Sequence, residues 1–80
     1  MKVSYKKLWH ILLDLDMKKK DLQEIAGLTG YMMHKLSRDE NVTTETIGKI
    51  CKALYCTMDE IMEFLPDDEV RIEERFKTRN

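Results

Sequence analysis

Apolar residues recur every three or four positions through the first fifteen residues, which is the period of one face of an α-helix. Ser4 precedes most of this run and is a good N-cap residue. Lys6, Lys7 and Asp14 fall toward the opposite side, which is expected to face solvent. The pattern predicts a first helix with a core stripe of Tyr5, Leu8, Leu12 and Leu15, widened by Trp9 and Ile11.

A second helix is predicted over residues 18–26, and a third begins almost at once after it. Gly27 follows the second helix, where glycine readily takes the positive φ of a helix end. Only Leu28 separates it from Thr29, a good N-cap for a third helix over residues 30–37. Two short helices joined by a short turn with glycine are typical of the helix-turn-helix motif. The expected core residues of this pair are Leu22, Ile25, Ala26, Met33 and Leu36.

Two more helices follow the polar segment SRDEN. Thr43 or Thr44 caps the fourth helix, and Thr57 with Glu60 forms a capping box that opens the short fifth. Pro66 closes the domain, so residues 1–66 are predicted to form one all-α domain of five helices. The apolar positions of the last two helices are Ile47, Ile50, Cys51, Leu54, Ile61, Met62, Phe64 and Leu65.

Residues 67–80 form a short, mostly charged tail. The spacing of Val70 and Ile72 favours a strand, and that of Ile72 and Phe76 favours a helix. The high charge favours disorder. A dimerisation extension is a further alternative, and the sequence does not decide among them.

Charge is divided unevenly along a chain that is nearly neutral in total. Residues 1–38 carry eight basic and four acidic side chains, a net charge of +4, whereas residues 39–80 carry six and eleven, a net charge of −5. Such a split suggests that one end meets a polyanion. Lys18, Lys19 and Lys20 begin a helix, where positive charge opposes the helix dipole. A feature that costs stability there favours a role in binding phosphate.

Metal, membrane and catalytic roles find no support in the residues. Cys51 and Cys56 lie five apart, which is neither a disulfide framework nor a zinc-site spacing. The apolar run WHILL is too short for a signal peptide or a bilayer span. No nucleophile stands beside a base. We therefore expect no enzyme, cofactor, metal, membrane association or small-molecule ligand, and a reducing cytoplasm suits the two unpaired thiols.

Three segments together resemble the Cro/lambda-repressor-like helix-turn-helix family, also called XRE. They are KKKDLQEIAGLTGYMMHKL, NVTTETIGKICKAL and TMDEIMEF, and the resemblance covers about residues 4–65. The opening MKVSYKKLW and the ending DEIMEFLPD are similar to very short regulators from Gram-positive bacteria and their mobile elements, such as VanU-type regulators. The resemblance implies a five-helix lambda-repressor-like fold and a bacterial, cytoplasmic transcriptional regulator that binds double-stranded DNA.

The same resemblance implies which residues face DNA. The positions that match those facing the major groove are Gly30, Tyr31, Met32 and Lys35. The implied phosphate contacts are Lys18, Lys19, Lys20, Thr29, His34, Arg38, Asn41 and Thr43. One position departs from the family, because Gln23 stands where a small residue is usual under the recognition helix. Either the two helices lie farther apart, or Gln23 tilts outward.

The third helix has the chemistry for sparing recognition of bases. Lys35 can donate to guanine O6 or N7, Tyr31 can lay its ring on a thymine methyl, and Met32 can make apolar contacts only. Tyr31 and Met32 also suit partial burial against a helix or a partner. That interpretation supports an alternative function, a protein-binding helix-turn-helix module that antagonises or partners another regulator.

A homodimer is the expected assembly. Phe64 and Leu65 are the predicted dimer residues, because so small a domain needs few apolar groups beyond Ile61 and Met62. Trp9 is expected in the core with its N–H bonded, and a dimer surface is its alternative. Dimers of the family read two half-sites about 34 Å apart.

Overall fold

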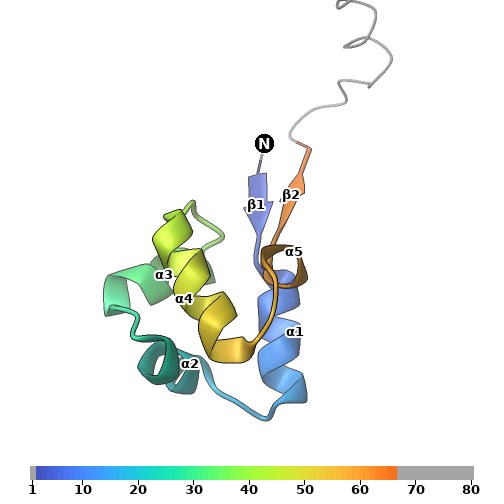
Figure 1. Cartoon of the computed structure of the whole chain (residues 1–80). Coiled ribbons are helices and arrows are strands. Elements are labelled where there is room, and N and C mark those ends of the chain that lie inside the picture. Colours follow the sequence, from blue (N-terminus) through green and yellow to red (C-terminus); the bar gives the residue numbers. More distant parts are fainter. Residues whose placement is uncertain (1, 67–80) are drawn as a thin grey trace, which may run out of the picture.

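The computed structural model describes residues 2–66, and the tail predicted over residues 67–80 lies outside that range. The described part contains five helices and a small two-stranded sheet, so the five-helix prediction is confirmed and the sheet is an addition (Figure 1). In chain order the elements are β1 (Lys2–Ser4), α1 (Lys6–Asp14), α2 (Lys19–Ala26), α3 (Gly30–Ser37), α4 (Thr44–Leu54), α5 (Met58–Ile61) and β2 (Glu63–Leu65).

The helix starts follow the capping residues of the sequence. The Thr29 hydroxyl accepts a hydrogen bond of 3.1 Å from the Met32 N–H and begins α3. The Thr43 hydroxyl caps α4, accepting from the Thr46 N–H at 3.2 Å, which decides between the two threonines. The predicted capping box at α5 is present. Ser4 is not the cap of α1, because it belongs to β1 and α1 begins after Tyr5.

Helices α1 to α4 all end in the same left-handed turn. In each, the N–H after a residue with positive φ donates to the carbonyl five residues earlier, as in a Schellman motif. The positive-φ residues are Asp16, Gly27, Asp39 and Tyr55. Glycine takes this conformation freely and aspartate tolerates it, but tyrosine is strained there. The fourth turn, at Tyr55, is therefore the costliest of the four.

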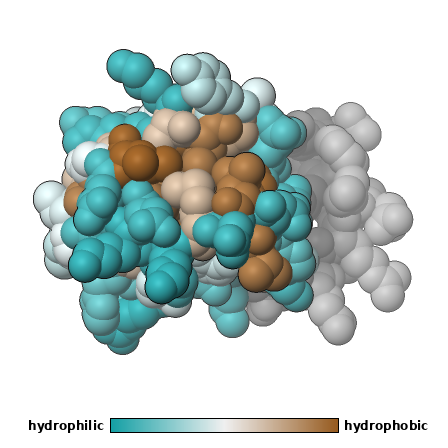
Figure 2. All heavy atoms as spheres, turned by 90° about the horizontal axis from the view of Figure 1, so that it is seen from below, coloured by the Kyte–Doolittle hydropathy of each residue, from teal (hydrophilic) through white to brown (hydrophobic). Residues whose placement is uncertain are grey.

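The core lies where α4 packs against α2 on one side and α5 on the other, with α1 packed against α5. Its buried apolar residues are Val3, Tyr5, Leu8, Leu12, Leu22, Ala26, Leu28, Met33, Leu36, Ile47, Ile50 and Ile61. A small core such as this one leaves several large apolar side chains at the surface. Viewed from below, the molecule shows such side chains among polar ones (Figure 2).

Two residues predicted for the core are exposed. Leu15 is 53% exposed because α1 ends at Asp14, and the chain then turns away through Asp16. Ile25 is 54% exposed. On a helix it lies about 80° from the centre of the stripe formed by Leu22 and Ala26, so it leans out of the core. Helical spacing predicted both apolar stripes but included one residue too many in each, Leu15 in the first helix and Ile25 in the second.

The sheet replaces the second half of the predicted fifth helix. α5 ends at Ile61, and Met62 is extended, with φ −147° and ψ 161°. Residues 63–65 then pair with β1 in antiparallel register, Val3 opposite Phe64. The prediction that Phe64 and Leu65 continue a helix is therefore wrong. A single turn of helix is weak alone, whereas pairing with β1 satisfies the backbone of both ends of the described chain.

Replacing Tyr55 by glycine should stabilise the protein. Tyr55 has φ 53° and its side chain is 97% exposed, so the change removes backbone strain and almost no packing. The expected gain in the free energy of unfolding is about 1 kcal/mol, measured by urea denaturation. Tyr55→Ala is the control, because alanine keeps the Cβ and the strain. Equal stability of the glycine and alanine variants would contradict the assignment of strain.

Candidate nucleic-acid interface

Helix α3 presents one polar face to solvent. Met33 and Leu36 point into the core, as predicted, and hold the helix against the domain. Gly30, Tyr31 and His34 are exposed, and Tyr31 is 69% exposed despite its large ring. The four residues predicted to face bases thus share one helix, although Met32 and Lys35 are only half-exposed.

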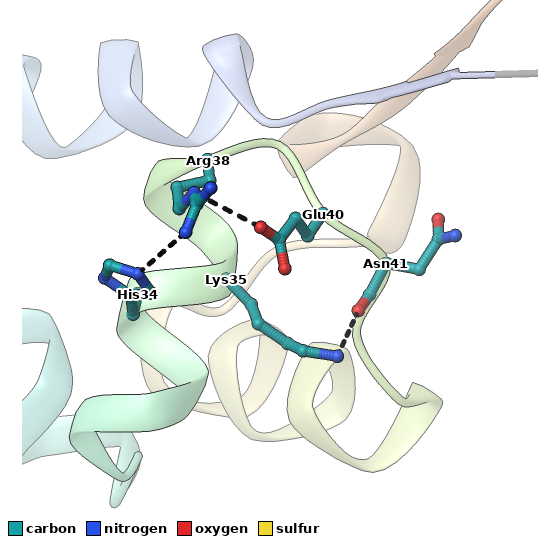
Figure 3. Close-up of polar contacts among 5 residues, drawn as sticks. All are labelled: His34, Lys35, Arg38, Glu40 and Asn41. Carbon is teal, nitrogen blue, oxygen red and sulfur yellow. Dashed lines mark hydrogen bonds and ion pairs between the residues drawn. The ribbon is translucent and has the colours of Figure 1, made fainter.

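Lys35 is held between Tyr31 and the loop after α3, and Figure 3 shows its contact with Asn41 of that loop. Its Nζ donates to the backbone carbonyl of Asn41 at 3.4 Å and lies 5.2 Å from the centre of the Tyr31 ring. At this distance an ammonium is attracted by the ring face. Both contacts are weak and solvent-facing, so they position the amine without preventing it from moving to a stronger acceptor.

Arg38 joins α3 to the following loop. Its Nη1 lies 3.2 Å from Nε2 of His34, and its Nε lies 3.3 Å from Oε2 of Glu40 (Figure 3). A guanidinium has no acceptor atom, so in this contact Nε2 of His34 is the acceptor. The Arg38 side chain is 62% exposed, which makes the pair with Glu40 an open surface contact.

Tyr5 fixes the position of this loop from the other side. Its N–H donates to Oδ1 of Asp39 at 3.1 Å, and its hydroxyl donates to the Glu40 carbonyl at 2.7 Å. The side chain is 1% exposed. Burial, and after it the nearby charge of Asp39, raises the pKa of Tyr5, so the hydroxyl keeps its proton and stays a donor. The loop is thereby tied to the start of α1.

The lysines at the start of α2 lie beside the end of α3. Nζ of Lys19 donates to Oγ of Ser37 at 3.2 Å and lies 4.3 Å from the centre of the Trp9 ring. Lys18 and Lys20 are exposed. Trp9 is half-buried and serves as a platform for a cation, which neither of its two predicted roles included. Positive charge from α2 thus reaches the same end of α3 as Arg38.

A shallow hollow separates α3 from the start of α4. It has a volume of about 360 Å³ and lies next to the exposed ring of Tyr31. Its lining residues are Tyr31, Met32, Lys35, Asn41, Val42, Thr43 and Thr46. A second hollow of about 620 Å³ adjoins it, where Lys35 and Arg38 meet Lys2 and Leu65 of the sheet. The sheet and the loop after α3 therefore line the same hollow.

A sequence model of the Cro/C1-type helix-turn-helix DNA-binding domain matches residues 7–67. The chain belongs to this family. The resemblance to XRE-type regulators is thereby confirmed, and the family is a DNA-binding class rather than a class of enzymes. The chain is also similar to the crystal structure of transcriptional regulator VanUg, with 42% sequence identity and a TM-score of 0.79. That similarity covers 82% of this chain and 88% of the other. No curated protein matches the chain significantly.

The expected site residues of this Cro/C1-type domain fall into two groups in space. Those of α3, the loop after it and the start of α2 lie together around one helix. Thr29 and Thr43 also cap helices, so their hydroxyls already accept backbone N–H groups. Phe64 and Leu65 stand apart on β2, and Leu65 also lines the hollow that contains Arg38. Gln23 is half-buried.

Sequence reasoning missed the residues that shape the site from below. Tyr5 was expected only in the core, and nothing in helical spacing points to its two bonds with the loop. Glu40 was treated as part of a polar loop, although an acid two residues from Arg38 is a visible signal of pairing. Val42 and Thr46 line the hollow by α3 because α4 folds back on it, which only the tertiary structure reveals.

Metal-binding and membrane-spanning features are absent from the described residues. Among residues 2–66, no three His, Cys, Asp or Glu side chains gather closely enough to hold a metal ion. No helix in that range has the length and apolar character needed to cross a bilayer.

Removing the Tyr5 hydroxyl should loosen the loop and lower stability. Tyr5→Phe keeps the ring in the core but leaves the Glu40 carbonyl without its 2.7 Å donor. The expected loss is about 1 kcal/mol in the free energy of unfolding, measured by urea denaturation. Tyr31→Phe is the matched control, because that hydroxyl belongs to a side chain that is 69% exposed and should change stability little. Equal effects of the two changes would contradict the anchoring role of Tyr5.

Proposed function

We propose that this chain is a transcriptional regulator that binds double-stranded DNA as a homodimer and reads the major groove with α3. The observation that carries the proposal is the exposed face of α3 with cations gathered at its end. An eight-residue helix is about 12 Å long, and the major groove is about 12 Å wide. The similarity to a solved transcriptional regulator supports the same function.

Phosphate binding is assigned to the side chains around α3. Lys18, Lys19 and Lys20 at the start of α2 carry three positive charges, and Arg38 adds one from the end of α3. Such charges bind the DNA backbone by releasing its condensed counterions. The remaining proposed phosphate contacts are polar or titratable groups at helix ends and in the loop, namely Thr29, His34, Asn41 and Thr43.

Base reading is assigned to Gly30, Tyr31, Met32 and Lys35. Among these four residues, only Lys35 has a cationic side chain. Its amine can exchange its two weak contacts for hydrogen bonds to guanine O6 and N7. The Tyr31 ring and Met32 line the hollow beside α4, which can receive a thymine methyl group. Gly30 has no side chain and allows the DNA to approach the helix backbone. With a single base-directed cation, specificity is expected to be modest.

Dimerisation is assigned to the sheet. Phe64 and Leu65 are 58% and 42% exposed, although both are large apolar residues. In the described part of the chain, β2 pairs on one edge only, which leaves a row of backbone groups for another strand. Leu65 also lines the hollow that contains Arg38. A second copy seated on β2 would form the homodimer, and we expect its two α3 helices to read related half-sites.

Selection of bound duplexes from a random pool tests the proposal. The full chain should enrich one site built of two inverted half-sites about 34 Å apart. A pool without any enriched site would contradict DNA reading and favour the protein-binding alternative. A single enriched half-site would contradict the homodimer and leave base reading supported.

Two variants connect the selected site to named residues. Lys35→Ala should relax the preference at one base pair per half-site, equivalent to about 1–3 kcal/mol. Phe64→Ser should reduce the selected site to one half-site. Lys52→Ala is the control, because Lys52 is an exposed cation near the other end of α4. If Lys52→Ala also changed the selected site, the effects of Lys35→Ala and Phe64→Ser could not be assigned to those two residues.

A further inference from the structure

Cys51 and Cys56 meet at the corner between α4 and α5. The Cys56 N–H donates to the Cys51 carbonyl at 3.1 Å, which is the six-to-one bond of the turn centred on Tyr55. In this turn the side chains at the two ends of that bond come into contact, and they are usually apolar. Here both side chains are free thiols, and both are half-buried.

The thiols influence each other in the folded protein. The pKa of Cys56 is raised to about 11, first by burial, then by the Cys51 thiol as a nearby titrating group and hydrogen-bond partner, and last by Glu60. The contact that the turn predicts therefore agrees with the chemistry of the side chains.

Reagents can reach the pair in part, because both cysteines are only half-buried. The intervening Tyr55 is 97% exposed, so its side chain does not pack over the two cysteines. Neither cysteine belongs to the proposed DNA interface, since the DNA contact proposed for α4 is its N-cap, Thr43. A packing role alone would be served equally well by valine or alanine at either position.

We propose that Cys51 and Cys56 form a dithiol site that closes to an intramolecular disulfide by exchange with a low-molecular-weight disulfide. One thiolate attacks a sulfur of the reagent, which forms a mixed disulfide and releases one thiol. The second protein thiolate then attacks the protein sulfur of that mixed disulfide and releases the second thiol. The protein loses two electrons and two protons, and the reagent gains both as two thiols.

Closure of this site is compatible with the existing backbone. The 3.1 Å hydrogen bond from the Cys56 N–H to the Cys51 carbonyl already brings the two backbones together, so we expect the disulfide to form by side-chain rotation without a rearrangement of α4. The raised pKa of Cys56 leaves little thiolate at pH 7, so the exchange should speed up as pH rises from 7 toward 9. The proposal is independent of DNA binding, because every step takes place at the far end of α4.

Mass spectrometry of the full, folded chain treated with oxidised glutathione at pH 8 to 9 tests the site. The expected product is a monomer lighter by two hydrogens, without a glutathione adduct, which a reductant converts back. Cys51→Ser and Cys56→Ser should each instead keep one glutathione as a stable adduct, because no second thiol can displace it.

Three outcomes would overturn the proposal. They are lasting adducts on both cysteines of the natural chain, a disulfide between two copies, and no reaction while the denatured chain reacts fully. Circular dichroism of both serine variants shows whether they are folded. If a serine variant fails to fold, the alanine variant at the same position replaces it, since alanine also removes the resolving thiol.

Discussion

The position of the loop after α3 depends on Tyr5. This residue connects β1 to α1 and bonds to Asp39 and Glu40, which lie 34 and 35 residues further along the chain. Its ring lies in the core, so the loop after α3 is fastened to the most stable part of the domain. Asp39 adds to this constraint by taking a positive φ, which turns the chain at the end of α3. Without that anchor, the exposed loop would have few contacts with the rest of the chain.

The anchor also determines how charge is arranged at the proposed interface. It places Glu40 within 3.3 Å of Arg38, so that the free protein holds its arginine in a surface pair rather than extended into solvent. Such exposed pairs contribute little to stability, and a DNA phosphate offers the guanidinium a stronger, bidentate partner. The amine of Lys35 likewise contacts Asn41 and the Tyr31 ring. The amine of Lys19 contacts Ser37 and the Trp9 ring. The cations are thus positioned by weak contacts that DNA can replace.

The helices were largely predictable from sequence because their signals are local. Thr29 and Gly27 mark the ends of α3 and α2 through side-chain capping and backbone freedom, and both act as predicted. The sheet was not predictable, because β1 and β2 are three residues each and pair across almost the whole domain. The site was predictable only as far as it lies on α3. Its floor, formed by Tyr5 and by residues of α4, depends on long-range packing that spacing along one chain does not encode.

Titration of a labelled duplex with the protein at several salt concentrations tests the central claim, DNA binding through the cations around α3. The logarithm of the affinity should fall linearly with the logarithm of salt concentration, with a slope of about −0.9 per phosphate contacted. Replacing Lys18, Lys19 and Lys20 by alanine should weaken binding to every duplex and flatten that slope, whereas Lys52→Ala should leave it unchanged. Affinity that does not respond to salt, or a triple variant that keeps the natural slope, would contradict the claim.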